Sequence, residues 1–392
     1  MKITKITPKL ISKYLFVEIE TDAGITGLGE CGSWGQLEAA QTAVEKFADY
    51  LIGKDPGPIE HHWNVMHRFS HFRGAAICGA ISAIDIALWD IKGQALGQPI
   101  HALLGGPTRT KARVYGHVKA ETKDEMVANC KKMQELGFTA IGHFNPFLDE
   151  DRDKPYYKSH ARKIDDAVAV VAAVREACGP DLDLCIEIHR RLTPAEAVVF
   201  AQELAPLRPM FYEDPIRPDS HDAMARVKDR ISIPLATGER FNSIYDFQAL
   251  LTREGVDSVR ISACLCGGIT GARKIAALAE AHDVQVIPHN PLSPVCLFAE
   301  LQLDAAIPNF AIQEYPTVGV GFEDKGTSNE PGTELADKGV VTNVPTFKDG
   351  FVDIPTAPGL GVKLAPGAAE NFPPFPRKVR MRPHADGFIV DQ

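Results

Sequence analysis

The sequence lacks three features that would each point to a different class of protein. No run of about 18 apolar residues occurs in the 392 residues, and the N-terminus has no apolar signal core, so we expect a cytoplasmic protein without a membrane partner. No block of Lys or Arg interrupts a chain of net charge −9, which argues against a nucleic-acid partner. The eight cysteines form no Cys-x-x-Cys pair, and we interpret them as buried free thiols.

The sequence does contain enough apolar residues for a large core. They make up 45% of the chain, and its length fits a barrel of roughly 250 residues plus an accessory domain. Residues 1–111 are predicted to form an α+β capping domain in which strands precede helices. Residues 112–355 are predicted to form a modified (β/α)8-type TIM barrel, and residues 356–392 a tail that returns to the cap.

The barrel prediction rests on a rhythm of strand-like and helix-like segments that starts near residue 112. The strand-like runs read ARVYGHV, TAIGHF, DLCIEI, MFYE, PLATGE, DSVRIS, VQVIPH and FAIQEY. Eight such units in succession favour a closed parallel barrel over a doubly wound sheet.

Three glutamates follow one another at intervals of 26 residues and close three of these runs: Glu187, Glu213 and Glu239. One strand, one helix and two short loops fill such an interval, which places the carboxylates on the same rim of neighbouring parallel strands. Three hard oxygen ligands converging there predict a Mg²⁺ site. Alternation along the first run aims His189 the same way as Glu187, with Leu184 and Ile186 on the opposite face.

The motifs FYEDP, ATGER, CGGITGARKIAALAEAHDV, PHNP and PGLGV, in this order, resemble the mandelate racemase subgroup of the enolase superfamily. Within that subgroup, IEIHRRLTPAEA and GERFNSIYDF are most similar to acid-sugar dehydratases acting on mannonate, gluconate and galactonate. The resemblance implies a capped barrel and one Mg²⁺ per subunit on the three acidic strand ends. It also implies abstraction of the proton next to a substrate carboxylate.

The resemblance assigns roles to further residues of this chain. His189 matches the dehydratase acid, His289 the histidine of the seventh strand, and Glu314 the polar residue that ends the eighth. Many members carry two lysines on the second strand, where this chain has His143 and Asn145 as candidate substrate contacts. A lysine base on that face is therefore absent.

A second departure concerns the base. Many members pair the seventh-strand histidine with an aspartate that ends the sixth strand, and this chain has Ser262 there. Without that carboxylate, His289 is expected to be a weaker base. The long polar loop 147–163 after the second strand suits a lid, so Tyr156 and Tyr157 are alternative candidates for the base.

Three other residues are candidate substrate contacts. Trp34 and Arg73 lie in segments of the cap that are predicted to close over the substrate. Arg260 faces the barrel interior, where it either contacts substrate or forms an ion pair with Glu239 or Glu314.

These observations together predict a Mg²⁺-dependent sugar-acid dehydratase that removes water from C2–C3 of an aldonate. One alternative is a racemase, epimerase or cycloisomerase on the same scaffold. Another is a non-catalytic protein that binds sugar acids. A small-molecule sugar acid is the expected partner, and we expect an even-numbered homo-oligomer.

Overall fold

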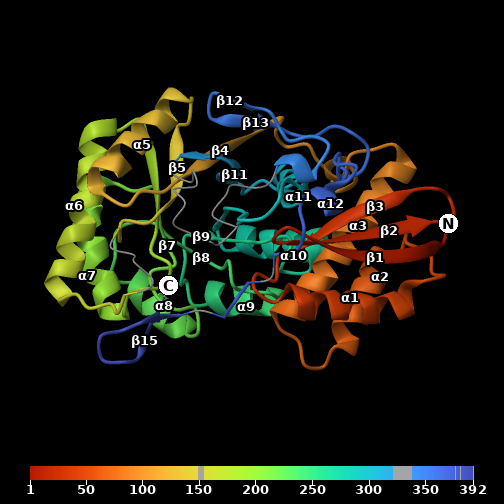
Figure 1. Cartoon of the computed structure of the whole chain (residues 1–392), viewed down its shortest axis with the longest axis horizontal. Helices are drawn as coiled ribbons and strands as arrows, with labels where there is room; N and C mark the ends of the chain where they lie inside the picture. The colour runs from red at the N-terminus through yellow and green to blue at the C-terminus, as the bar shows by residue number, and fades with distance from the viewer. Residues whose placement is uncertain (149–153, 321–337, 376, 380, 392) are drawn as a thin grey trace.

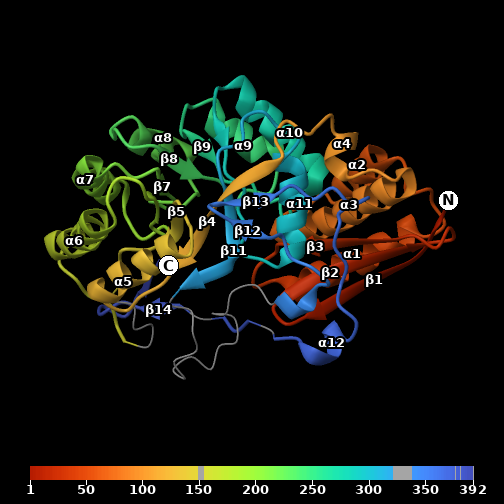
Figure 2. The same ribbon diagram turned by 90° about the horizontal axis from the view of Figure 1, so that it is seen from above.

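The structure is a computed structural model that describes residues 1–148, 154–320, 338–375, 377–379 and 381–391 (Figure 1). The capping domain and the barrel lie side by side, with the N-terminal strands at the end away from the barrel helices (Figures 1 and 2). Within the described residues, no helix combines the length and apolarity needed to cross a bilayer. Asp149–Asp153 of the predicted lid lie outside the described residues.

The cap consists of a three-stranded antiparallel sheet followed by helices. Its elements are β1 (Ile3–Ile11), β2 (Tyr14–Thr21), β3 (Thr26–Cys31), α1 (Leu37–Leu51), α2 (Ile59–Phe69), α3 (Ala75–Leu96) and α4 (Ile100–Leu103). Helix α3 ends at Leu96, and Gly97 follows it in the left-handed conformation that suits glycine.

The barrel strands occur in the predicted order and run parallel. They are β4 (Lys111–Val118), β5 (Ala140–Phe144), β6 (Asp183–Glu187), β7 (Phe211–Glu213), β8 (Leu235–Thr237), β9 (Ser258–Val259), β10 (Gln285–Val286) and β11 (Gln313–Val320). The helices between them are α5 (Lys123–Glu135), α6 (His160–Cys178), α7 (Pro194–Leu204), η1 (Ala205–Leu207), α8 (His221–Lys228), α9 (Ile244–Leu251), α10 (Gly268–Ala281) and α11 (Pro294–Asp304).

The strands close into a barrel. Each strand from β4 to β10 pairs with the next, and β11 pairs with β4. Val286 completes the ring through backbone hydrogen bonds with Asn309 and Ala311, just before β11. The fold is therefore the predicted α/β barrel with an α+β cap.

The side chains of β6 confirm the predicted alternation. Leu184 and Ile186 belong to the large core between strands and helices, whereas Cys185 packs in a small cluster with Tyr115 and Phe211 from other strands. The barrel interior is thus a packed core, which holds the strand ends rigidly. All eight cysteines are free, and all except the half-buried Cys178 are buried.

The C-terminal segment contacts both parts of the molecule. Its elements are η2 (Lys338–Val340), β12 (Phe347–Lys348), β13 (Phe351–Asp353), α12 (Ala368–Asn371), β14 (Arg382–Pro383) and β15 (Ile389–Val390). Strand β13 pairs with β4, and Ser12 of the cap exchanges backbone hydrogen bonds with Phe372 and Phe375. Residues 321–337, which belong to the predicted barrel domain 112–355, lie outside the described residues.

Buried carboxylates join the cap to the barrel. Glu30 accepts hydrogen bonds from Ser293 and Cys296 at the N-terminus of α11, and Asp85 accepts one from the Thr270 backbone in the first turn of α10. Burial raises the pKa of both carboxyl groups to about 7, although these hydrogen bonds oppose the shift. Polar contacts as well as apolar packing therefore hold the two parts together.

Candidate metal centre and active site

The three glutamates of the 26-residue series converge at the carboxyl ends of β6, β7 and β8. Glu187 and Glu213 are direct partners in the β6–β7 register, and Glu239 follows β8 by two residues. One oxygen of each carboxylate lies within 4.8 Å of those of the other two, and all three side chains are buried. The spacing in the sequence thus becomes a single cluster of oxygen atoms.

Each carboxylate of the cluster has a different cationic or imidazole partner. Nη1 of Arg190 lies 2.6 Å from Oε1 of Glu239, and Nε of Arg260 lies 2.5 Å from Oε1 of Glu213. Burial raises the pKa of Glu213 well above its ordinary value, with Arg260 opposing that shift and Glu187 adding to it. The cluster therefore holds more negative charge than its arginines neutralise.

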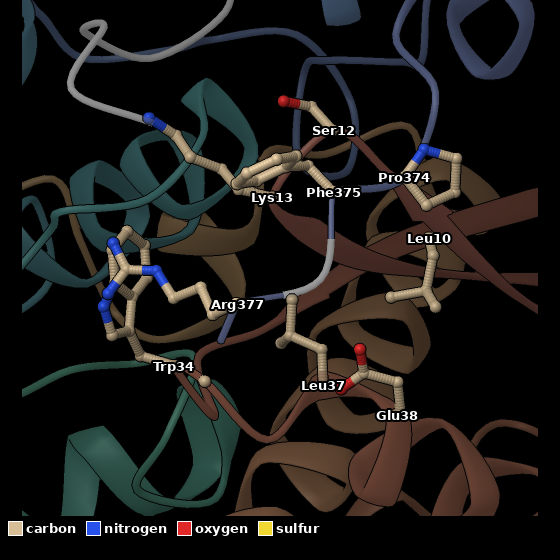
Figure 3. Close-up of a pocket in the computed structure, with 10 residues that line it drawn as sticks. Leu10, Ser12, Lys13, Trp34, Leu37, Glu38, Pro374, Phe375 and Arg377 are labelled. Carbon is tan, nitrogen blue, oxygen red and sulfur yellow. The ribbon is translucent and has the colours of Figure 1, made fainter. Parts of the chain in front are cut away.

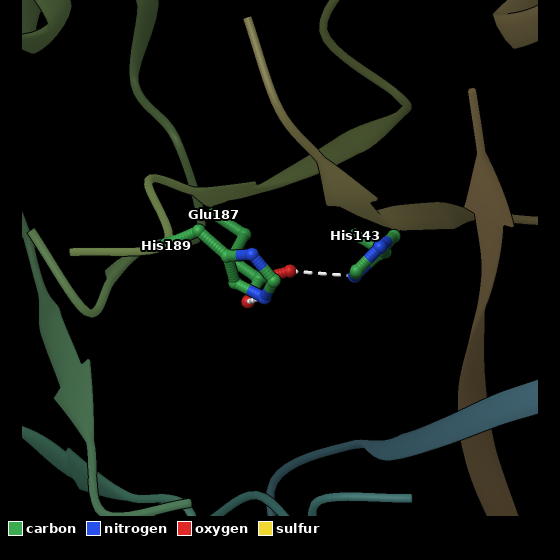
Figure 4. A group of neighbouring side chains, drawn as sticks. All are labelled: His143, Glu187 and His189. Carbon is green, nitrogen blue, oxygen red and sulfur yellow. Dashed lines mark ion pairs between the residues drawn. The ribbon is translucent and has the colours of Figure 1, made fainter. Parts of the chain in front are cut away.

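Two histidines contact the first carboxylate from either side (Figure 4). Nδ1 of His143 lies 2.6 Å from Oε2 of Glu187, and Nε2 of His189 lies 2.8 Å from Oε1. The rings are 40% and 29% exposed, so both have a free face beside the carboxylates. His189 therefore points toward the carboxylate cluster, as the alternation along the first strand-like run predicts.

These contacts shift pKa values in opposite directions. Burial disfavours protonation of His143, but Glu187 outweighs it and raises the pKa of His143 to about 9. Burial also works against ionisation of Glu187, and the two histidines nevertheless hold its pKa well below the ordinary value. From the sequence, His143 is a candidate substrate contact, and its contact with Glu187 was not predicted.

His289 lies at the other end of the carboxylate row. Its Nε2 is 3.2 Å from Oε2 of Glu239, so a carboxylate does contact this ring, contrary to the expectation that the ring would lack one. Nδ1 of His289 is buried and has no hydrogen-bond partner among the described residues. The backbone of His289 pairs with Ile261, next to the serine that occupies the position of the expected aspartate. One ring nitrogen of His289 therefore pairs with Glu239, and the other has no hydrogen-bond partner among the described residues.

Arg260 is 1% exposed and joins two carboxylates. Its Nη2 lies 2.5 Å from Oε2 of Glu314, as predicted, but its second partner is Glu213 and not Glu239. The Arg260 backbone donates to the Thr237 carbonyl of β8, while the Arg260 side chain reaches Glu213 at the end of β7. Glu314 also accepts from His117 on β4, at 3.0 Å, a contact that the sequence analysis did not identify.

The strand ends around the cluster have unusual backbone conformations. His143, His189, Arg190 and Asp214 all have positive φ values, between 41° and 66°. Such values are uncommon for residues other than glycine, and they cost free energy that the surrounding structure must supply. Several neighbouring strands therefore end in sharp changes of direction that aim side chains at one place.

The remaining candidates lie in other surroundings. The guanidinium of Arg377 lies 3.7 Å from the ring centroid of Trp34, at a cavity between the cap and the C-terminal segment (Figure 3). Arg73 donates to the carbonyls of His67 and Ser70 at the end of α2. The side chain of Asn145 accepts from the Phe147 backbone. Contact of these residues with substrate remains a prediction.

The lid tyrosines lie against the C-terminal hairpin. The Tyr156 backbone donates to the Pro383 carbonyl and accepts from Ala385. Tyr157 is 73% exposed, and its ring contacts that of His384. The two tyrosines thus sit where the hairpin meets the loop.

The donor set fits a divalent cation. Five buried carboxylates, those of Glu187, Glu213, Glu239, Glu314 and Asp214, lie beside two buried arginines, Arg190 and Arg260, and beside His143, whose pKa is raised to about 9. Carboxylates therefore outnumber the cationic groups, and a buried charge without a counter-ion is costly. Three convergent carboxylate oxygens are the ligands that Mg²⁺ prefers. The residues present therefore suit a hard divalent cation.

An eight-stranded barrel with acidic strand ends, histidines beside them and an α+β cap defines a class of metal-assisted enzymes. Residues 4–105 match the N-terminal domain of the mandelate racemase / muconate lactonizing enzyme family, and residues 125–368 match the enolase C-terminal domain-like family. The chain belongs to the enolase superfamily, and it is a dehydratase, a carbon–oxygen lyase of that superfamily.

Two relatives are similar along nearly the whole chain. The D-galactonate dehydratase of Pectobacterium atrosepticum is 38% identical over 93% of this chain and 92% of its own. That of Variovorax paradoxus is 37% identical over 100% of both chains.

Solved structures show the same fold. An enolase from Agrobacterium radiobacter, crystallised with sodium and L-malate, covers 100% of both chains at 29% identity and a TM-score of 0.90. The 3,6-anhydro-D-galactonate cycloisomerase of Zobellia galactanivorans is 27% identical, with a TM-score of 0.81, over 95% of this chain and 99% of its own.

Proposed function

We propose that the protein is a Mg²⁺-dependent dehydratase of sugar acids that converts an aldonate into a 2-keto-3-deoxy acid. The observation that carries the proposal is the row of three buried carboxylates with His189 at one end and His289 at the other. The D-galactonate dehydratases among its relatives support an aldonate as substrate.

Glu187, Glu213 and Glu239 would hold the Mg²⁺. The chemistry that Mg²⁺ supplies at such a site is positive charge opposite the anion that forms when a proton beside a carboxylate leaves. Enolase-superfamily sites with a Lys or His base and Mg²⁺ are a general example of tuned acid–base chemistry. Here the lysines are absent, so the histidines are the candidates for proton transfer.

His289 is assigned the role of base and His189 that of acid. His289 accepts the C2 proton, and the electron pair of that C–H bond forms the C2–C3 double bond as the 3-hydroxyl leaves. His189 donates the proton that turns the leaving hydroxide into water. The resulting enol rearranges to the 2-keto acid, and solvent restores both histidines. One molecule of water is lost, so atoms and charge balance.

The positions of the tyrosines favour the histidine as base. His289 bonds directly to a carboxylate of the cluster, whereas Tyr157 is largely exposed against the C-terminal hairpin and Tyr156 forms a β-bridge with the same hairpin. A general base must come within hydrogen-bond distance of the proton that it removes. The geometry of His289 meets this requirement with less rearrangement.

The test is turnover across a panel of aldonates, with Mg²⁺ and after treatment with EDTA. We expect 2-keto-3-deoxy acid to form with Mg²⁺ only, and Glu213→Gln to abolish turnover while the fold stays cooperative. Glu45→Gln, at an exposed glutamate of α1 in the cap, is the matched control. Undiminished turnover in EDTA would overturn the metal assignment.

The same panel separates the alternatives. Exchange of the C2 proton with deuterated water without loss of water would indicate a racemase or epimerase. Saturable binding without exchange or turnover would indicate a non-catalytic binder. We also propose a homo-oligomer, which light scattering coupled to size-exclusion chromatography tests.

A further inference from the structure

Two histidines and one carboxylate form a second group of side chains suited to metal binding, beside the three glutamates. Ligand atoms of His143, Glu187 and His189 lie within 4.8 Å of one another (Figure 4). Within the part of the chain that the structure describes, this is the one such group of three or more that includes nitrogen donors. Glu187 belongs to both groups, so the two lie directly side by side.

The donor atoms of this group differ from those of the three glutamates. Carboxylate oxygens suit Mg²⁺, whereas imidazole nitrogens suit ions such as Zn²⁺ and Ni²⁺. Two histidines and one glutamate, with a further position open, are the ligand set of several catalytic zinc sites. The rings of His143 and His189 are 40% and 29% exposed, so a dissolved ion can reach them. The group therefore suits a borderline transition metal ion better than Mg²⁺.

The distances are close to those that such an ion requires. Two imidazoles bound at ~2.0–2.1 Å to one tetrahedral ion have ring centroids ~5 Å apart, and a nitrogen and an oxygen bound to it lie ~3.3 Å apart. The rings of His143 and His189 have centroids 5.6 Å apart and planes at 86°. Their nitrogens lie 2.6 and 2.8 Å from oxygens of Glu187. An ion that replaces these hydrogen bonds therefore needs side-chain movements on the order of 1 Å.

Neighbouring groups hold both histidines in place. The ring of His117 stacks on that of His143, with centroids 5.1 Å apart. On either side of His189, backbone amides donate to the carbonyls of Glu213 and Asp214 at the end of β7. Ligands that packing and hydrogen bonds fix in this way favour binding, because little order must be created when the ion arrives.

The second barrel strand supplies one of these ligands through a departure from the superfamily pattern. Many members have lysine where this chain has His143. A lysine there would bring a positive charge and three donors but no lone pair, whereas histidine offers a lone pair to a cation. The departure that removes a lysine base thus also provides a metal ligand.

We propose that His143, Glu187 and His189 form a second metal site, which takes a borderline divalent cation such as Zn²⁺ beside the Mg²⁺ of the three glutamates. Glu187 offers one oxygen to each ion, as carboxylates can in two-metal sites with ions ~3.5–4 Å apart. An ion on Nε2 of His189 occupies the lone pair that would carry the proton, so Zn²⁺ inhibits dehydration. This inhibition rests on the proposed function, whereas the binding of the ion does not.

The experiment titrates Co²⁺ into EDTA-treated protein that has been supplied with a large excess of Mg²⁺. Visible absorption of Co²⁺ reports nitrogen ligation, and equilibrium dialysis counts the bound ions. The ion must displace the proton that Glu187 holds on His143, so the titration is run at pH 8 to limit this competition. We expect one Co²⁺ per chain, with Zn²⁺ displacing it.

Substitutions then identify the ligands. His143→Asn and His189→Gln should each weaken Co²⁺ binding by roughly 10²-fold or more, because loss of a ligand exceeds the 10–100-fold effect of losing a group that supports one. His160→Asn is the matched control and should bind as the wild type does. His160 lies 3.5 Å from Glu196 but belongs to no group of three ligands among the described residues. Urea denaturation checks that each variant unfolds cooperatively.

Two results would overturn the site. Co²⁺ binding that survives both histidine substitutions, or that the excess of Mg²⁺ abolishes, would place the ion on the three glutamates. These binding results stand even if no sugar acid turns over and the proposed function fails. If turnover occurs, Zn²⁺ should inhibit it in the presence of excess Mg²⁺, and undiminished turnover with the site filled would overturn the inhibitory role.

Discussion

Arg260 offers the sharpest test of the buried charge network. The side chain is 1% exposed and lies 2.5 Å from carboxylate oxygens of both Glu213 and Glu314. It also donates to the carbonyls of Ile287 and Pro288. Replacement by Met keeps much of the apolar volume and removes every one of these contacts.

The expected loss is large because two acceptors are left without their cation. Removal of one partner from a buried ion pair costs about 3–5 kcal/mol, and here one arginine serves two carboxylates. We therefore expect Arg260→Met to lower the free energy of unfolding by at least about 3 kcal/mol at neutral pH without Mg²⁺. Part of this loss should be recovered in Arg260→Met/Glu314→Gln, because one buried charge is gone.

The pH dependence has a definite sign. Burial opposes ionisation of Glu314, but Arg260 holds its pKa well below the ordinary 4.5 in the folded protein. Its stabilising contribution is present above that ordinary value and is lost as the pH falls through the lowered one. Without Arg260 the lowering is gone, so the difference between variant and wild type should shrink as the pH falls below about 4.5.

Urea denaturation in EDTA at several pH values measures these differences from the midpoint, provided that the slope stays constant. Arg162→Met, which removes an exposed ion pair with Asp166 on α6, is the control and should change stability by less than about 1 kcal/mol. A loss below about 1 kcal/mol in Arg260→Met would refute the view that Arg260 neutralises the carboxylates.

Four further substitutions test the site and the interface between cap and barrel. His189→Gln should lower dehydration by roughly 10² or more, and continued C2 exchange in deuterated water would place it in the leaving-group step. His289→Asn should eliminate that exchange, and exchange at the wild-type rate would end its assignment as base. Asp85→Asn should be more stable than wild type at pH 8, by on the order of 2–4 kcal/mol, because burial raises the pKa of this carboxyl to about 7. The penalty for its ionisation accrues as the pH rises from about 4 to 7, so the two proteins should converge near pH 4, and a constant difference across that range would contradict the argument. Glu213→Gln should stabilise the EDTA-treated protein and lose the rise in melting temperature that Mg²⁺ gives the wild type, both readable by thermal denaturation.

The sequence predicts the features that depend on short-range patterns. The 26-residue interval works because each βα unit returns the chain to the same rim, so position in the unit determines position in space. Alternation within β6 likewise places Cys185 inside and Leu184 outside, as the structure shows. The cap helix Ala75–Leu96 likewise ends at a local signal, because glycine at position 97 adopts a left-handed conformation.

Such short-range patterns did not predict the contacts between residues of distant strands. The sequence placed Arg260 on the inward face, but its pairing with Glu213 and not with Glu239 depends on where the two carboxylates lie in three dimensions. Likewise, His143 reaches Glu187 with a positive φ of its own, a conformation that no local signal predicts for a histidine. The pairing of Tyr156 with the C-terminal hairpin joins segments more than 200 residues apart. In each case the local sequence does not distinguish between the possible partners, and the tertiary structure determines which of them is in contact.

The electrostatics of the carboxylate row distinguish a functional cluster from a structural one. If the cluster served stability, replacement of one of its carboxylates by an amide would lower the free energy of unfolding, because Arg190 or Arg260 would then lack its charged partner. Here the burial of three carboxylates within 4.8 Å raises the pKa of Glu213 well above its ordinary value. In the absence of a cation this arrangement costs free energy, which the packed barrel and the cap supply. Glu213→Gln should therefore relieve repulsion and remove activity together, a combination that a structural ion-pair network would not show.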